Sequence, residues 1–196
     1  MPKASIQTNN IRRSPRWGMG LEPGDEASAF NLMNANIEHG GDEVSLAEVV
    51  TEQGAIVVFE CNHCPYVIGS IERIEKMAAR AREYGIGFVG INSNDSVKYP
   101  ADSFENMKKR ATEMSYPYLY DETQEVAEGW GAERTPEFFL LNGKSEVVYR
   151  GRLDNSPNDP TQANTSELMD ALDAMLMGES PITNRTKSIG CSVKWK

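Results

Sequence analysis

A continuous apolar run, followed by a C-x-x-C motif and an amphipathic segment, is the feature that most constrains the fold. The run Ala55–Phe59 is rich in β-branched residues, which predicts a buried central strand. Beyond the motif, apolar residues recur at helical spacing over 67–81, with charged residues on the opposite face. Cys61 and Cys64 therefore lie where a strand ends and a helix begins, and Pro65 fits the first turn of that helix.

Other strands and helices alternate along the chain in a pattern typical of an α/β fold. Further strands are predicted at 30–32, 87–92, 135–141 and 146–150, with Asn142-Gly143 as a hairpin turn between the last two. Helices are predicted at about 46–52, 102–114, 121–130 and 165–177, the first three capped by Ser45 with Glu48, Asp102 with Glu105, and Asp121 with Gln124. This order predicts a mixed central sheet of four or more strands with helices on both faces.

The 196 residues suit one domain with extensions. We expect an N-terminal extension over 1–21, a domain over 22–178 and a basic C-terminal tail over 179–196. Residues 1–16 and 185–196 each hold four basic residues and no acid, which leaves 12 basic and 29 acidic residues between them, a charge of −17. Opposite charge favours contact between these ends and the body, and solvated tails are the alternative.

Composition and targeting signals exclude several classes of protein. The net charge of −9 argues against nucleic-acid binding. No stretch approaches the roughly 18 apolar residues of a membrane-spanning helix, and no apolar segment follows the paired arginines near the N-terminus. Three cysteines do not form a secreted disulfide framework. We therefore expect a cytoplasmic protein with neither nucleic-acid nor membrane partners.

The C-x-x-C motif predicts thiol–disulfide chemistry. The thiolate is the reactive form of cysteine, and a helix N-terminus stabilises it. A second cysteine three residues on can close a disulfide, so Cys61 can attack a partner's disulfide and Cys64 can resolve the mixed disulfide. A charged His63 between them would favour the thiolate, whereas the Glu60 carboxylate would oppose it. The residues leave open which of these two effects dominates.

Several motifs together resemble the thioredoxin superfamily. These are C-N-H-C-P at a strand–helix junction, Thr135-Pro136 before a strand and the Asn-Gly-Lys hairpin. The segment 24–32, GDEASAFNL, resembles the opening of the redoxin branch, the alkyl-hydroperoxide-reductase and thiol-specific-antioxidant group with its thioredoxin-like relatives. The resemblance covers about 22–178. It implies a thioredoxin-like fold with a redoxin-type N-terminal extension.

The resemblance also implies roles for single residues. Cys61 matches the nucleophilic cysteine, Cys64 the resolving cysteine and Pro136 a cis-proline opposite the disulfide, while Thr135 offers its backbone to a bound peptide. The implied function is a thiol–disulfide oxidoreductase in redox homeostasis. It would act on protein disulfides, take electrons from a thiol reductant such as a thioredoxin or glutathione system, and need no bound cofactor.

Two other functions stay open. One is a thiol-dependent antioxidant peroxidase with Cys61 as the peroxidatic cysteine, although Val58 stands where peroxiredoxins place a threonine. The other is a metal-binding or non-catalytic module. For zinc, only His39, His63 and Cys191 could complete the four ligands that the motif begins, so no metal is expected.

Three auxiliary residues are weaker candidates. Glu60 is a candidate proton acceptor for Cys64, because the preceding strand holds no carboxylate. Arg134 could add positive potential near Cys61, although a solvated surface arginine is the simpler interpretation. Cys191 is an ordinary free cysteine by default and a third redox thiol as the alternative. We predict that the tail docks on the acidic body and brings Cys191 or Trp195 near the motif.

Overall fold

The computed structural model describes residues 20–196, so the predicted N-terminal extension lies almost wholly outside the described residues. The elements in chain order are β1 (Asn31–Asn34), β2 (Glu43–Ser45), α1 (Leu46–Val49), β3 (Ala55–Phe59), α2 (Pro65–Ile68), α3 (Ile71–Glu83), β4 (Gly87–Asn92), η1 (Pro100–Asp102), α4 (Phe104–Ala111), β5 (Tyr118–Tyr120), α5 (Glu125–Trp130), β6 (Arg134–Thr135), β7 (Glu137–Leu141), β8 (Val147–Gly151), η2 (Pro160–Gln162), α6 (Glu167–Leu176) and β9 (Cys191–Ser192).

The central sheet has seven strands in the order β2-β1-β5-β4-β3-β7-β8. β3, β4 and β5 are parallel, as the helices between them require. β7 and β8 form the antiparallel hairpin predicted at Asn142-Gly143. The mixed α/β fold is therefore confirmed, and every residue of β3 is buried, as expected for a central strand.

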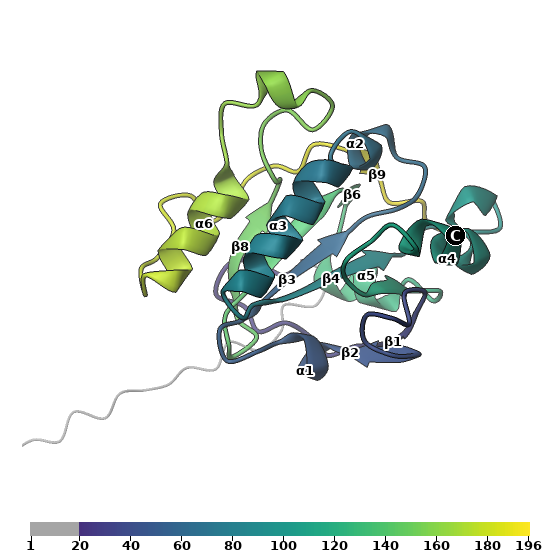
Figure 1. Cartoon of the computed structure of the whole chain (residues 1–196), viewed down its shortest axis with the longest axis horizontal. Coiled ribbons are helices and arrows are strands. Elements are labelled where there is room, and N and C mark those ends of the chain that lie inside the picture. The colour runs from purple at the N-terminus through teal and green to yellow at the C-terminus, as the bar shows by residue number, and fades with distance from the viewer. Residues whose placement is uncertain (1–19) are drawn as a thin grey trace, which may run out of the picture.

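Helices cover both faces of the sheet (Figure 1). On one face α2, α3, α4 and α6 pack over Ile56, Val58 and their neighbours, and this core includes both cysteines of the motif. On the other face α1 and α5 pack over Val57 and Phe59, with Trp130 fully buried among aromatic rings. The alternation of β3 side chains between two cores explains why the whole strand is apolar.

The helix predicted after the motif is interrupted. α2 ends at Ile68 with Gly69 as its C-cap, and α3 begins at Ile71 after a break. The Ser70 hydroxyl donates to the Pro157 carbonyl at 3.1 Å. A Cβ atom at Gly69 would lie 2.9 Å from that same oxygen. A distant loop therefore packs against the break, a tertiary contact that helical periodicity cannot reveal.

The predicted cap at Asp102 is wrong. α4 begins at Phe104 with Ser103 as its N-cap, and Asp102 closes the short 3-10 turn before it. Its side chain is fully buried and turns toward the C-x-x-C motif. The capping box of Ser45 and Glu48 is present, but α1 ends at Val49 rather than near residue 52.

The C-terminal tail is part of the fold. It leaves α6, crosses the end of the sheet and finishes near α4 (Figure 1). Within it, β9 pairs antiparallel with β6, and the Lys194 carbonyl accepts from the Asp95 backbone N–H at 2.8 Å. Trp195 remains 41% exposed. The tail thus lies against the body as expected, but backbone pairing holds it rather than burial of the tryptophan. In residues 20–196 no helix is long and apolar enough to span a membrane.

Candidate active site

The two cysteines of the motif lie at the end of β3 and the start of α2. Cys61 follows the strand within the connecting loop, and Cys64 is the N-cap of the helix, with Pro65 in the first turn. Both are free thiols, with 1% and 0% of their surface exposed. The helix N-terminus therefore acts most directly on Cys64, whereas the sequence led us to expect it at Cys61.

Thr135 contacts both sulfurs from the opposite side. The Cys64 sulfur lies 3.1 Å from the Thr135 carbonyl oxygen, to which it donates while it is protonated. The Thr135 hydroxyl lies 3.5 Å from the Cys61 sulfur. The peptide bond between Thr135 and Pro136 is cis, as the resemblance implies. The residue pair that precedes β7 therefore lies directly beside the dithiol.

The surroundings shift the pKa values of the two thiols in opposite directions. The neighbouring Cys61 thiol lowers the pKa of Cys64 to about 4. Thr135 and the backbone of Cys191 act in the same direction. The neighbouring Cys64, burial and the nearby Asp102 carboxylate raise the pKa of Cys61. The site therefore stabilises one thiolate, and its charge rests on Cys64.

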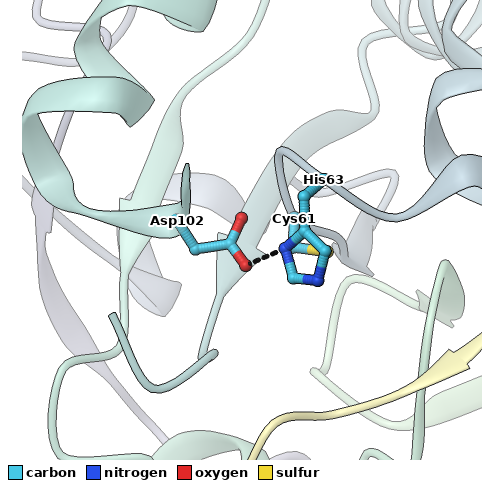
Figure 2. A group of neighbouring side chains, drawn as sticks. All are labelled: Cys61, His63 and Asp102. Carbon is cyan, nitrogen blue, oxygen red and sulfur yellow. Dashed lines mark hydrogen bonds and ion pairs between the residues drawn. The ribbon is translucent and has the colours of Figure 1, made fainter. Parts of the chain in front are cut away.

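His63 is held by a buried carboxylate. Its Nδ1 atom donates to Asp102 at 2.6 Å, as the dashed line in Figure 2 marks. Asp102 also accepts from the Asn62 backbone at 2.7 Å and from the Asn94 side chain at 2.8 Å. The imidazole stacks on Tyr99 with an interplanar angle of 1°. These contacts fix the ring between the loop and η1, next to Cys61.

Glu60 lies in a different network. Its carboxylate is fully buried, forms an ion pair with Arg110 and accepts from the Tyr116 hydroxyl at 2.9 Å. Arg110 also donates to the Cys61 carbonyl at 2.8 Å. In residues 20–196 no hydrogen bond joins Glu60 to either sulfur of the motif. The network explains how a carboxylate can be buried beside the motif, and a proton-acceptor role for Glu60 stays a prediction.

Arg134 and Cys191 meet in the β6–β9 pair. The Arg134 guanidinium donates to the Gly190 carbonyl at 2.9 Å. Burial and Cys64 raise the pKa of the Cys191 thiol, and the charges of Lys194 and Arg134 oppose this shift. From the sequence we expected Arg134 to add positive potential near Cys61. In the structure its charge acts on Cys191 in the tail.

Asp102 and Arg110 were missed as site residues by the sequence analysis. Both come from the segment after β4, about 40 to 50 positions beyond the motif. Asp102 resembled a helix cap, and nothing in the sequence singled out Arg110. Asp102 and Arg110 reach the site because η1 and α4 pack beside the motif. No local pattern in the sequence predicts this packing.

Cys61, His63 and Asp102 offer one ligand-type atom each within 4.8 Å of one another (Figure 2). Within residues 20–196, these three side chains form the group that could hold a metal ion. Structural zinc sites use four protein ligands and catalytic sites three with an open position. Here His63 and Asp102 already bind each other, so metal binding would replace an existing hydrogen bond.

The Redoxin family model matches residues 22–168. The chain belongs to the Redoxin family. This match spans the motif, the cis-proline and most of the sheet, and it ends within α6. The tail with Cys191 lies beyond the matched region. No curated protein matches the chain significantly.

Solved structures agree with the family. An uncharacterized conserved protein of Geobacillus kaustophilus is 41% identical, with a TM-score of 0.83, over 91% of this chain and 94% of that one. A peroxidoxin of Mycobacterium tuberculosis is 17% identical, with a TM-score of 0.59, over 80% and 97%. The thioredoxin domain of a thiol-disulfide oxidoreductase of Bacteroides vulgatus is 16% identical, with a TM-score of 0.55, over 72% and 96%. The fold of this redoxin is therefore thioredoxin-like.

Proposed function

We propose that this redoxin is a thiol–disulfide oxidoreductase that cycles Cys61 and Cys64 between dithiol and disulfide. The observation that carries the proposal is the placement of two free thiols at the start of a helix, with both sulfurs against Thr135 beside the cis-proline. A thiolate beside a second thiol can attack a disulfide and then release the product by intramolecular exchange. The substrate is a protein disulfide, and the electrons come from a thiol or dithiol reductant.

The order of attack follows from the charge. The resemblance assigns first attack to Cys61, and that assignment stays a prediction. The lowered pKa of Cys64 favours the opposite order, in which Cys64 attacks the substrate and Cys61 resolves the mixed disulfide. Trapping separates the two orders, because the variant that accumulates mixed disulfides is the one that retains the attacking cysteine.

A redox titration tests the function directly. The protein is equilibrated in buffers of reduced and oxidised dithiothreitol, and its free thiols are counted by mass after alkylation. We expect two thiols to be lost together in a single two-electron step, with a Cys61–Cys64 disulfide in the peptide map. We also expect reduction of a protein disulfide substrate, and loss of that activity in a Cys61→Ala/Cys64→Ala variant. Oxidation of the cysteines one at a time would contradict the proposal.

The peroxidase alternative is tested with the same material. Consumption of hydrogen peroxide with a thiol donor should remain near the uncatalysed rate, because the raised pKa of Cys61 disfavours the thiolate that would attack the peroxide. Metal analysis of the reduced protein addresses the metal-binding alternative. Stoichiometric zinc that blocks alkylation of Cys61 would favour that alternative over the redox function. Cytoplasmic localisation remains a prediction from the sequence.

His63→Ala should make the couple less oxidising. The His63 imidazole donates to the Asp102 carboxylate and screens its charge, and removal of the ring leaves that negative charge beside the thiols. The carboxylate then disfavours the thiolate and hence the reduced form, so the reduction potential should fall on the order of 30 mV, about 1.4 kcal/mol. Equilibration with glutathione buffers measures the shift.

The matched control for this variant is Asp102→Asn. It should raise the potential, and the double variant His63→Ala/Asp102→Asn should lie nearer the wild type than either single change. An increase in potential for His63→Ala would show that the helix N-terminus and Thr135, not the charge balance, set the potential.

A further inference from the structure

The three cysteines of the chain converge on one residue. β9 pairs with β6 and places Cys191 opposite Thr135. The Thr135 carbonyl accepts from the Cys64 thiol, and its hydroxyl lies beside the Cys61 sulfur. Thr135 therefore joins the tail cysteine to the two cysteines of the motif, although the tail is distant in sequence.

The Cys64 sulfur is the common neighbour of the other two thiols. Cys61 and Cys191 lower the pKa of Cys64, and Cys64 raises the pKa of both other thiols, so the charges of the three cysteines are coupled. Cys191 also packs against the core cluster that contains Cys61 and Cys64. A disulfide forms only between sulfurs that can approach closely, and Cys64 and Cys191 both lie directly beside Thr135.

The segment around Cys191 is fixed on both sides. Arg134 donates to the Gly190 carbonyl at 2.9 Å, and the Val193 N–H donates to the Glu133 carbonyl at 3.0 Å. Further on, the Lys194 N–H donates to the Asn94 side chain at 2.8 Å. Val193 is buried. The position of Cys191 is therefore built into the fold and differs from that of a frayed terminus.

Accessibility distinguishes the third thiol from the other two. The sulfurs of Cys61 and Cys64 are buried beneath the surrounding structure, whereas Cys191 is partly exposed. An external thiol can therefore reach Cys191 more readily than it reaches the pair. Burial and Cys64 raise the pKa of this thiol, and the positive charges of Lys194 and Arg134 oppose that shift. The same positive charges attract an anionic thiol to Cys191.

We propose that Cys191 is a third redox cysteine, which exchanges with the Cys61–Cys64 disulfide to form a Cys64–Cys191 disulfide. This inference rests on the proposed function, since the pair must first be oxidised. The Cys191 thiolate attacks the Cys64 sulfur, the Cys61–Cys64 bond breaks, and Cys61 leaves as a thiolate that takes up the proton lost by Cys191. No electrons enter or leave in this step. It moves the disulfide from a buried pair to one with a partly exposed sulfur.

A dithiol reductant completes the cycle. One of its thiolates attacks the Cys191 sulfur, and Cys64 leaves as a thiolate. The second thiol of the reductant then displaces Cys191 and closes the reductant's own disulfide. Low-pKa thiols are the better leaving groups, and the lowered pKa of Cys64 suits it to this step.

The experiment removes Cys61, which competes with Cys191 for disulfide formation with Cys64. The reduced Cys61→Ala variant is treated with one equivalent of diamide, quenched at intervals and mapped by mass spectrometry without reduction. We expect rapid loss of both remaining thiols and a Cys64–Cys191 link within one chain. The matched control is Cys61→Ala/Cys191→Ser/Ser192→Cys, which moves the tail thiol to the neighbouring exposed position. Closure should be about 100-fold slower in this control, because the favourable alignment is lost.

Each outcome is decisive. Closure in Cys61→Ala that is no faster than in the control overturns the inference, as does oxidation that gives only links between chains. Circular dichroism establishes that the variants are folded, and Cys61→Ser repeats the measurement with a smaller packing change. The proposed function is tested separately in Cys191→Ser, which should still form the Cys61–Cys64 disulfide. If Cys191→Ser does not form the Cys61–Cys64 disulfide, the proposed function is contradicted. The rate of Cys64–Cys191 closure in Cys61→Ala is a separate measurement and tests the further inference.

Discussion

Cys64→Ser is expected to abolish the thiolate of the reduced protein at neutral pH. With the pKa of Cys64 lowered to about 4, the wild type should show the ultraviolet absorbance of one thiolate down to about that pH and lose it below. In Cys64→Ser this absorbance should be absent, because the surroundings of Cys61 raise the pKa of that thiol. Reduction of a protein disulfide should fall at least about 1000-fold, since no intramolecular exchange remains.

Two variants serve as controls for this result. Cys191→Ser should retain the absorbance, because the Cys61 thiol is the main stabiliser of the Cys64 thiolate. Cys61→Ala should retain a thiolate that titrates at higher pH, since the largest cause of the lowered pKa of Cys64 is then lost. Retention of the full absorbance in Cys64→Ser would show instead that Cys61 carries the charge, as the resemblance implies.

The same charge links redox state, stability and pH. The pKa of a cysteine in an unfolded chain is about 8.5. A lowered pKa in the folded protein therefore stabilises the fold, and this contribution is fully present above about pH 8.5. The contribution decreases as pH falls and is lost below about pH 4. Because only the reduced form gains this stabilisation, the couple becomes more oxidising. Denaturant unfolding of reduced and oxidised protein at several pH values measures the difference.

The local part of the site could be predicted from the sequence because its signals are local. The apolar run, the motif and the helical periodicity after it place Cys61 and Cys64 at a strand–helix junction, where the structure has them. The hairpin at Asn142-Gly143 is a turn signal of the same kind. Each of these patterns depends on a few neighbouring residues, and their physical causes act over the same distance.

The remaining parts of the site depend on contacts between distant segments. β2 and β5 have three residues each, too few to show a period. Asp102 carries the sequence pattern of a helix cap, and only the packing of η1 beside the motif turns its carboxylate to His63. The tail was expected to dock through opposite charge. Arg185 does form an ion pair with Glu22, but backbone pairing at β9 positions Cys191.

Gly190→Ala should release the tail from the site. A Cβ atom at this position would lie 2.0 Å from the Thr135 carbonyl oxygen and 2.7 Å from its carbon, which are backbone atoms that cannot move aside without shifting β6. The pairing of Thr135 with Cys191 should therefore be lost. Alkylation of Cys64 by iodoacetamide should then accelerate at least about 10-fold, as the free energy of local opening falls by about 1.4 kcal/mol or more.

The control for this prediction is Ser192→Ala, which changes an exposed side chain of the same short strand. It should leave alkylation at the wild-type rate. Faster alkylation in Gly190→Ala, together with loss of the Cys64–Cys191 link on oxidation, would show that one contact both covers the dithiol and aligns the third cysteine. Equal rates in Gly190→Ala and the wild type would mean that the burial of Cys64 depends on α2 and Thr135 alone, because the tail could then leave without exposing the sulfur.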